Sequence, residues 1–233
     1  MASRSVEPAE GSRDVRLWDL PIRLIHWSFV LLLIGLWWSA EQAKDIDLHK
    51  KFGYALLGLL VFRLLWGFVG SSTARFSQFV RGPGGVFSYL RSRGAEPVVG
   101  HNPLGGWSVI ALLLLLSMQL LIGLFAQDVD GIESGPLSYL VDYETADWAR
   151  ELHHLLFNGV LALVVLHVGA VLFYRLVHRN DLIRPMITGR KSFATAVAPP
   201  TIAPWWRALV CLAIASAVAI WVSAGCPLPW TTS

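Results

Sequence analysis

The feature that most constrains the fold is the stretch from Trp148 to His178, which we predict as the fourth span. Its middle, the apolar run from Leu155 to Tyr174, contains no charged residue. A helix of this length is about 30 Å long, which matches the hydrocarbon core of a bilayer. The sequence therefore predicts a membrane-spanning helix here. This span also contains a histidine, His167. Polar side chains at such a depth are costly and usually functional.

A second histidine, His153, lies fourteen positions before His167. Fourteen residues of helix rise about 21 Å and leave the two side chains about 40° apart around the axis. The adjacent His154 is about 140° away from His167 and faces elsewhere. Two imidazoles on one face, at two depths, indicate two metal or haem sites stacked across the membrane.

The composition agrees with a membrane protein. The 233 residues are 55% hydrophobic and only 15% charged, whereas soluble domains are less apolar and more charged. Further spans are predicted at about 21–40, 49–69, 107–126 and 205–224. We expect an all-α integral membrane protein with a four-helix bundle and a fifth, C-terminal transmembrane helix. The predicted parts are an N-terminal arm (1–20), a histidine-bearing transmembrane core (21–191), and a linker with the fifth helix (192–233).

Several chemistries are excluded by missing motifs. The two cysteines, Cys211 and Cys226, form no C-x-x-C-H motif, so covalent haem attachment is not expected. They are also too few for an iron–sulfur cluster. No phosphate-binding glycine loop, zinc-protease helix or nucleophile triad is present. We expect no nucleic-acid partner.

Charge patterning predicts the orientation in the membrane, because Lys and Arg concentrate in cytoplasmic loops. Basic residues gather in the arm, in the 70–104 loop and in the connector after the fourth span, whereas the loop at 127–150 is acidic. The basic residues are Arg4, Arg13, Arg16, Arg23, Arg75, Arg81, Arg91, Arg93, Arg179, Arg184, Arg190 and Lys191. We therefore expect a multi-pass protein of the bacterial inner membrane, with a cytoplasmic N-terminus and a periplasmic C-terminus.

Depth then pairs the histidines. His26 lies near the inner start of the first span, and His49 lies at the outer start of the second. Depth therefore pairs His49 with His153 outside, and His26 with His167 inside. Bis-histidine ligation of two b-type haems explains all four positions. The remaining histidines, His101, His154 and His178, have no depth-matched partner, and we interpret them as loop or interfacial residues, or as neighbours of the sites.

Basic side chains near the predicted haems have two readings. Arg63 is the one charge inside the second span. With Arg23, it either binds the propionates of the inner haem or snorkels to the interface. Lys50 has the same two readings at the outer haem.

The sequence resembles the bacterial di-haem cytochrome b561 family, which includes the b-type cytochrome subunits of nickel–iron hydrogenases. The resemblance covers about residues 16–191. It rests on seven segments in order: RLWDLPIRLIHW (16–27), HKKFGY (49–54), RLLWGFVG (63–70), HNPLGGW (101–107), LHHLLFN (152–158), LHVGA (166–170) and MITGRK (186–191). It implies a four-helix core and haem ligands at His26, His49, His153 and His167. The fifth span departs from the family pattern.

We therefore expect an electron-transfer protein of a respiratory chain, acting alone or as a subunit of an oxidoreductase. Its two b haems would carry electrons between the membrane quinone pool and a periplasmic redox protein such as a cytochrome c. The acidic outer loop favours a basic partner of that kind. The alternatives are the membrane anchor and electron acceptor of a hydrogenase or other dehydrogenase, a non-redox membrane scaffold, and a transition-metal transporter. The spans hold no carboxylates for a transport path. A homodimer is left open.

Overall fold

The computed structural model describes residues 14–91, 98–128, 130, 133–193 and 195–227. Most of the arm, with Arg4 and Arg13, and part of the 70–104 loop, with Arg93, lie outside these residues. Five helices in the described part are long and apolar enough to cross a membrane. They are α1 (Leu20–Glu41), α2 (Ile46–Val69), α5 (Pro103–Gly123), α6 (Tyr143–Leu176) and α8 (Trp205–Ser223). The predicted class, an all-α membrane protein with five spans, is confirmed.

Four of these helices begin at an acidic or amide N-cap. The side chains of Asp19, Asp45, Asn102 and Asp142 each accept a hydrogen bond from the backbone N–H three residues later, at 2.7–2.9 Å. Such a cap satisfies one of the free donors of the first turn. The cap at Asn102 explains why α5 begins at Pro103, four residues before the predicted start of the third span at 107.

The fourth span differs most from its prediction. The sequence predicted an acidic loop over 127–150, but the structure contradicts its last part, because α6 already begins at Tyr143. Asp142 caps the helix there, and no proline or glycine follows until Gly159. A helix of 34 residues is about 51 Å long and exceeds the bilayer core of about 30 Å. Its first turns therefore extend beyond the apolar region, at the acidic end of the molecule.

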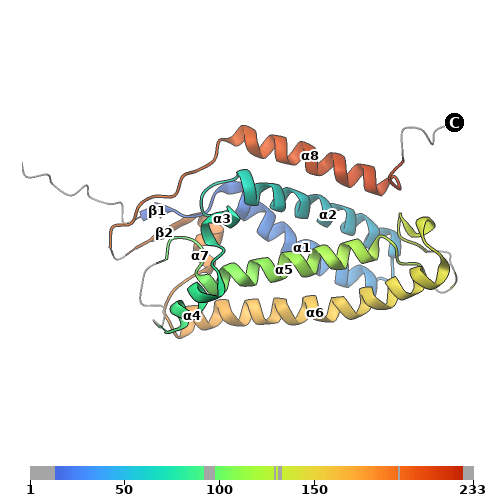
Figure 1. Ribbon diagram of the computed structural model, residues 1–233, viewed down its shortest axis with the longest axis horizontal. Coiled ribbons are helices and arrows are strands. Elements are labelled where there is room, and N and C mark those ends of the chain that lie inside the picture. Colours follow the sequence, from blue (N-terminus) through green and yellow to red (C-terminus); the bar gives the residue numbers. More distant parts are fainter. Residues whose placement is uncertain (1–13, 92–97, 129, 131–132, 194, 228–233) are drawn as a thin grey trace, which may run out of the picture.

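The long helices lie side by side (Figure 1). α2 packs against α1 on one side and α8 on another, while α6 packs against α5. Small residues allow α8 to approach α2. A Cβ on Gly58 would lie 3.4 Å from the Cβ of Ala219 and 3.7 Å from the carbonyl oxygen of Ala215. Cys211 is buried near this contact, as expected for a small packing residue.

The short elements gather at the end of the bundle where α1 begins (Figure 1). They are α3 (Phe76–Phe79), α4 (Pro83–Arg91), α7 (Ile183–Thr188), β1 (Asp14–Arg16) and β2 (Arg190–Ser192). We call this end the inner end. The opposite end, with the short helix η1 (Ser138–Leu140) and the start of α6, is called the outer end.

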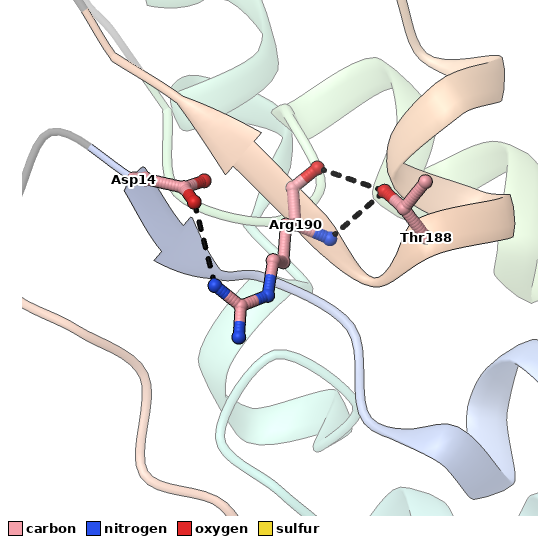
Figure 2. Close-up of polar contacts among 3 residues, drawn as sticks. All are labelled: Asp14, Thr188 and Arg190. Carbon is pink, nitrogen blue, oxygen red and sulfur yellow. Dashed lines mark hydrogen bonds and ion pairs between the residues drawn. The ribbon is translucent and has the colours of Figure 1, made fainter.

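A two-stranded antiparallel ribbon joins the arm to the connector after α6. Asp14 pairs with Ser192, and Arg16 pairs with Arg190. The Arg190 guanidinium lies 3.4 Å from the Asp14 carboxylate. The Thr188 hydroxyl donates to the Arg190 carbonyl oxygen and accepts from the Arg190 backbone N–H (Figure 2). Part of the 1–20 arm is thus paired with residues 190–192. The division of the chain at 20 and 191 stays a prediction.

Gly189, directly before strand β2, adopts the left-handed conformation, with φ = 81°. Its carbonyl accepts hydrogen bonds from the backbone N–H groups of Leu17 and Trp18. A Cβ here would lie 2.9 Å from the Trp18 carbonyl oxygen and 3.1 Å from Nε of Arg23. Only glycine fits such a close approach without strain.

The apolar core consists of two clusters. One lies toward the inner end around Trp18, Phe62 and Trp66, and the other lies toward the outer end around Leu56, Leu113 and Leu120. Among the described residues, no side chain of α6 belongs to either cluster. The most apolar span therefore contributes little to the protein core, although it carries both His153 and His167.

Candidate haem-binding sites

The outer histidine pair joins α2 to α6. The ring centroids of His49 and His153 lie 6.3 Å apart, with the ring planes at 81°. Nδ1 of His49 is 3.0 Å from the Leu36 carbonyl oxygen, and Nδ1 of His153 is 2.9 Å from the Gln119 carbonyl oxygen. A carbonyl can only accept, so each Nδ1 carries the proton and each Nε2 keeps its lone pair for a metal ion.

The inner histidine pair joins α1 to α6. The ring centroids of His26 and His167 lie 6.4 Å apart, with the ring planes at 52°. Nδ1 of His26 is buried and has no hydrogen-bond partner among the described residues. The two pairs share α6, and the fourteen positions from His153 to His167 separate them by about 21 Å along the axis of that helix.

The spacing within both pairs fits one metal ion between two imidazoles. With each nitrogen about 2 Å from the ion and each ring centre about 1 Å farther, the ring centroids would lie about 6 Å apart. Space for a flat macrocycle is seen beside the outer pair. Apart from its own helix backbone and chain neighbours, no described atom lies within 4 Å of a Cβ on Gly53, which shares the helix face of His49 one turn later. The residues therefore fit a b-type haem at each pair.

A glycine of α5 shapes the outer site. A Cβ on Gly123 would lie 2.7 Å from Cε1 and 2.9 Å from Nδ1 of His153. The imidazole can therefore lie against the α5 backbone only because this position lacks a side chain. The same contact places Nδ1 beside the Gln119 carbonyl.

The neighbouring histidine is outside the pair. Within the described residues, the ring that faces His49 at this distance is that of His153, whereas His154 is bonded only through its backbone, to Asn158. This placement agrees with the helical phase deduced from the sequence. The assignment of His26, His49, His153 and His167 as ligands stays a prediction.

The predicted basic residues have different surroundings. Arg63 is only 4% exposed, and its guanidinium lies over the Phe76 ring, 5.0 Å from the centroid. Arg23 is tied to the connector through a bond from Nη1 to the Ile187 carbonyl. Lys50 forms an ion pair with Asp47 at 3.4 Å.

Lys50 also lines a groove of about 440 Å³ at the outer end. The groove lies between the start of α2, Ser134 and Pro136 of the outer loop, and Ser223–Gly225 at the end of α8. Lys50 thus faces α8, and it already has an acidic partner. A role at the outer haem therefore gains no support from its position.

Two residues at the inner end were not among the predicted site residues. The His101 ring packs between those of Trp18 and Phe79, with ring centroids 4.7 Å and 4.5 Å away and tilted planes. Arg75 directly precedes α3, with a buried Nε. The one signal in the sequence is that both belong to the basic loop that precedes α5.

Comparisons with known proteins agree with this geometry. The family model described as prokaryotic cytochrome b561 matches residues 17–189. A probable Ni/Fe-hydrogenase B-type cytochrome subunit of Bradyrhizobium diazoefficiens is 26% identical, over 82% of this chain and 92% of that protein. A probable subunit of the same kind from Rhizobium leguminosarum bv. viciae is 24% identical, over 80% and 92%.

A third relative with this description, from Rhodobacter capsulatus, is 17% identical over 81% of this chain and 85% of that protein. No solved structure matches the chain significantly. The family match covers four of the five spans, both histidine pairs and the connector up to Gly189. The chain therefore belongs to the prokaryotic cytochrome b561 family and is a multi-pass, b-type membrane cytochrome of electron transport.

Proposed function

We propose that this cytochrome holds two b haems, each between two histidines, and connects a redox protein at its outer end with the membrane quinone pool. The observation that carries the proposal is the pair of 6.3 Å and 6.4 Å imidazole spacings at two depths of one helix. A haem supplies reversible one-electron exchange at each site. The protein supplies the four imidazoles, their orientation and an apolar surrounding.

The chain's own groups prepare the outer site before any ligand binds. The carbonyls of Leu36 and Gln119 select the tautomer of His49 and His153 and fix the ring directions. The carbonyls belong to α1 and α5, so all four core helices contribute to this site. The apolar helices around it limit the access of water, which favours electron exchange without proton uptake at the metal.

A Ni/Fe hydrogenase is the partner that we favour at the outer end. Three relatives carry the description of a hydrogenase B-type cytochrome subunit, and each alignment covers at least 80% of this chain. The acidic side chains around the start of α6 support a second candidate, a basic periplasmic cytochrome c. They include Asp128, Glu133, Asp142, Glu144 and Asp147.

Affinity purification of the full chain from its native membranes separates the two partners. We expect a hydrogenase or another dehydrogenase subunit to co-purify at high salt, because such subunit interfaces are largely apolar. A cytochrome c bound by the acidic end would instead dissociate as the ionic strength rises. Absence of any redox protein at both salt concentrations contradicts the proposed connection.

Haem content tests the sites themselves. We expect two non-covalent b haems per chain, both low-spin, because each iron would have two imidazole ligands. A pyridine haemochrome assay on purified protein measures the ratio, and the optical spectrum reports the spin state. A haem-to-protein ratio near zero would favour the membrane-scaffold alternative, and a ratio near one would contradict one of the two proposed haem sites. Reoxidation of the reduced protein by added quinone tests the quinone link.

A further inference from the structure

The inner end contains several buried basic nitrogens without a hydrogen-bond acceptor. Within the described residues these include Nε of Arg23, Nη1 of Arg63, Nε of Arg75 and Nδ1 of His101, besides Nδ1 of the proposed ligand His26. Buried polar atoms are nearly always hydrogen-bonded, so a cluster of unpartnered nitrogens requires an explanation. The general preference for Lys and Arg in cytoplasmic loops does not explain this burial, because a loop residue that only sets the topology can keep its charged group in water.

The outer end is different. Two of its basic residues, Lys50 and Arg150, form ion pairs with Asp47 and Asp147, at 3.4 Å and 2.7 Å. Among the described residues, the buried basic nitrogens without a partner lie at the inner end, whereas the unpartnered buried atom beside the outer pair is an amide oxygen, Oε1 of Gln119. The two sites therefore differ in the charge that surrounds them.

Contacts between rings bring the unpartnered groups together. The His101 ring lies 4.5 Å from Phe79, Phe79 lies 5.8 Å from Phe76, and the Arg63 guanidinium lies over Phe76. Gly67 makes this possible, because a Cβ there would overlap the Phe76 ring. Arg75 is the residue next to Phe76 and caps the same short helix.

His101 also lies within electrostatic reach of the inner pair. Burial is the main cause that lowers the pKa of His101 to about 3, and the charge of Arg63 and the rings of His167 and His26 act in the same direction. His101 and Arg63 therefore share one low-dielectric region with both inner histidines.

The local charge does not balance. One carboxylate, Asp19, is buried here, and its two oxygens accept hydrogen bonds from the Ile22 backbone and from Nε1 of Trp66. Among the described residues, Arg63 is buried and Arg23 and Arg75 are half-buried, so three cations with unpartnered nitrogens share this end with one buried carboxylate whose oxygens are already occupied. A b haem carries two propionate groups, whose negative charge would offset this excess.

We propose that Arg63, Arg75 and His101 form an anion-binding site for the propionates of the inner haem. The inference rests on the proposed function and adds two positioning residues, Arg75 and His101, that come from the loop between α2 and α5. The positive field of the two arginines stabilises the reduced, less positive iron, and His101, as a neutral imidazole, adds a hydrogen bond that offsets propionate charge. Together they raise the midpoint potential of the inner haem above that of the outer haem.

Redox titration of the purified full-length protein tests this inference. We expect Arg63→Gln, Arg75→Gln and His101→Phe each to lower the potential of the haem that His26→Ala removes, and to leave the other unchanged. Loss of either arginine should change the equilibrium constant for electron transfer between the two haems about tenfold. This is the effect of a unit charge about 10 Å from the iron at an effective dielectric constant of about 20. The phenylalanine keeps an aromatic ring between Trp18 and Phe79.

Matched controls are Arg91→Gln and His178→Phe, which remove an exposed arginine and an exposed histidine at the same end. They should shift neither potential, because solvent and salt screen exposed charges. If Arg63→Gln loses the inner haem, Arg63→Lys should retain it, because the charge is kept.

Two haems with the same potentials in the three variants as in the controls overturn the inference, while the proposed function stands. Loss of the inner haem in both Arg63 variants, with unchanged potentials in Arg75→Gln and His101→Phe, also overturns it. A wild-type protein without haem overturns both the inference and the proposed function.

Discussion

His153 and His154 show how much one position matters at the residue scale. They are adjacent in sequence. The His153 ring faces His49 with a centroid distance of 6.3 Å and its Nδ1 lies at hydrogen-bond distance from the Gln119 carbonyl oxygen, whereas His154 lies outside the pair. The difference follows from the 100° that separates neighbouring residues of a helix. The two positions therefore offer an internal comparison for every test of ligation.

We predict that His153→Ala and His49→Ala remove or convert the same haem and leave the other spectrally intact. The haem-to-protein ratio should fall from about two to about one, or one haem should become high-spin, since one imidazole ligand is lost. His154→Ala should retain both haems. If His154→Ala loses the outer haem and His153→Ala keeps it, the helical register deduced here is wrong.

Gly123 tests the same site from the opposite helix. In Gly123→Ala the new methyl group would lie 2.7 Å from Cε1 of His153, so the ring must move and its bond to Gln119 is strained or lost. We expect a weakened or lost outer haem and an unchanged inner haem in low-temperature optical spectra. Gly84→Ala, which has open space around the new methyl group, is the control. Two unaltered haems in Gly123→Ala would contradict the packing described for His153.

At the scale of elements, α6 and α8 have opposite roles. α6 carries a predicted ligand of each proposed site and packs mainly on α5, whereas α8 carries no histidine and packs mainly on α2. The fifth helix departs from the four-helix pattern of the family, and its contacts indicate a structural role. Gly58, Ala215 and Ala219 let the two backbones approach, as small residues do between membrane helices.

We predict that Gly58→Leu destabilises the protein without removing haem. A leucine must displace α8, because even a Cβ at this position is already in contact with Ala219 at 3.4 Å. Overpacking of this kind costs about 1–3 kcal/mol. Thermal unfolding in detergent, followed by haem absorbance, should begin at a lower temperature, while Gly84→Leu serves as the surface control. Loss of either haem at low temperature would mean that α8 supports the sites directly.

At the scale of the whole molecule, the two ends differ in charge and in construction. The inner end holds the short helices, the ribbon and the basic loop, and the outer end holds the acidic start of α6. The described arm and the end of α8 lie at opposite ends of the bundle (Figure 1), as five spans require. This arrangement favours binding of a redox protein at the outer end and reaction with a membrane quinone elsewhere on the bundle.

We predict a cytoplasmic N-terminus and a periplasmic C-terminus, because the described parts of the basic segments lie at the inner end. Reporter fusions after Lys191 and after Ser233 should report opposite sides of the membrane. Fusions that report the same side would show that Trp205–Ser223 does not span, and the five-helix topology would be wrong.

The sequence by itself determined the properties that depend on neighbours along the chain. Hydropathy located the five spans, the 3.6-residue period placed His153 and His167 on one face, and charge separated the two ends. The predicted start of the fourth helix was wrong because an acidic stretch can form either a loop or a capped helix end, and Asp142 decides between them. The resemblance to the cytochrome b561 family was confirmed by the family match over residues 17–189.

Only the tertiary structure decided the contacts between distant segments. It placed Lys50 on a groove beside α8, paired the arm with residues 190–192, and brought His101 close to the inner histidines. These contacts depend on how loops fold back over the ends of the helices, and the order of residues does not encode them locally. Helical phase can be deduced from a short window of sequence, whereas the position of a loop depends on the packing of the whole bundle.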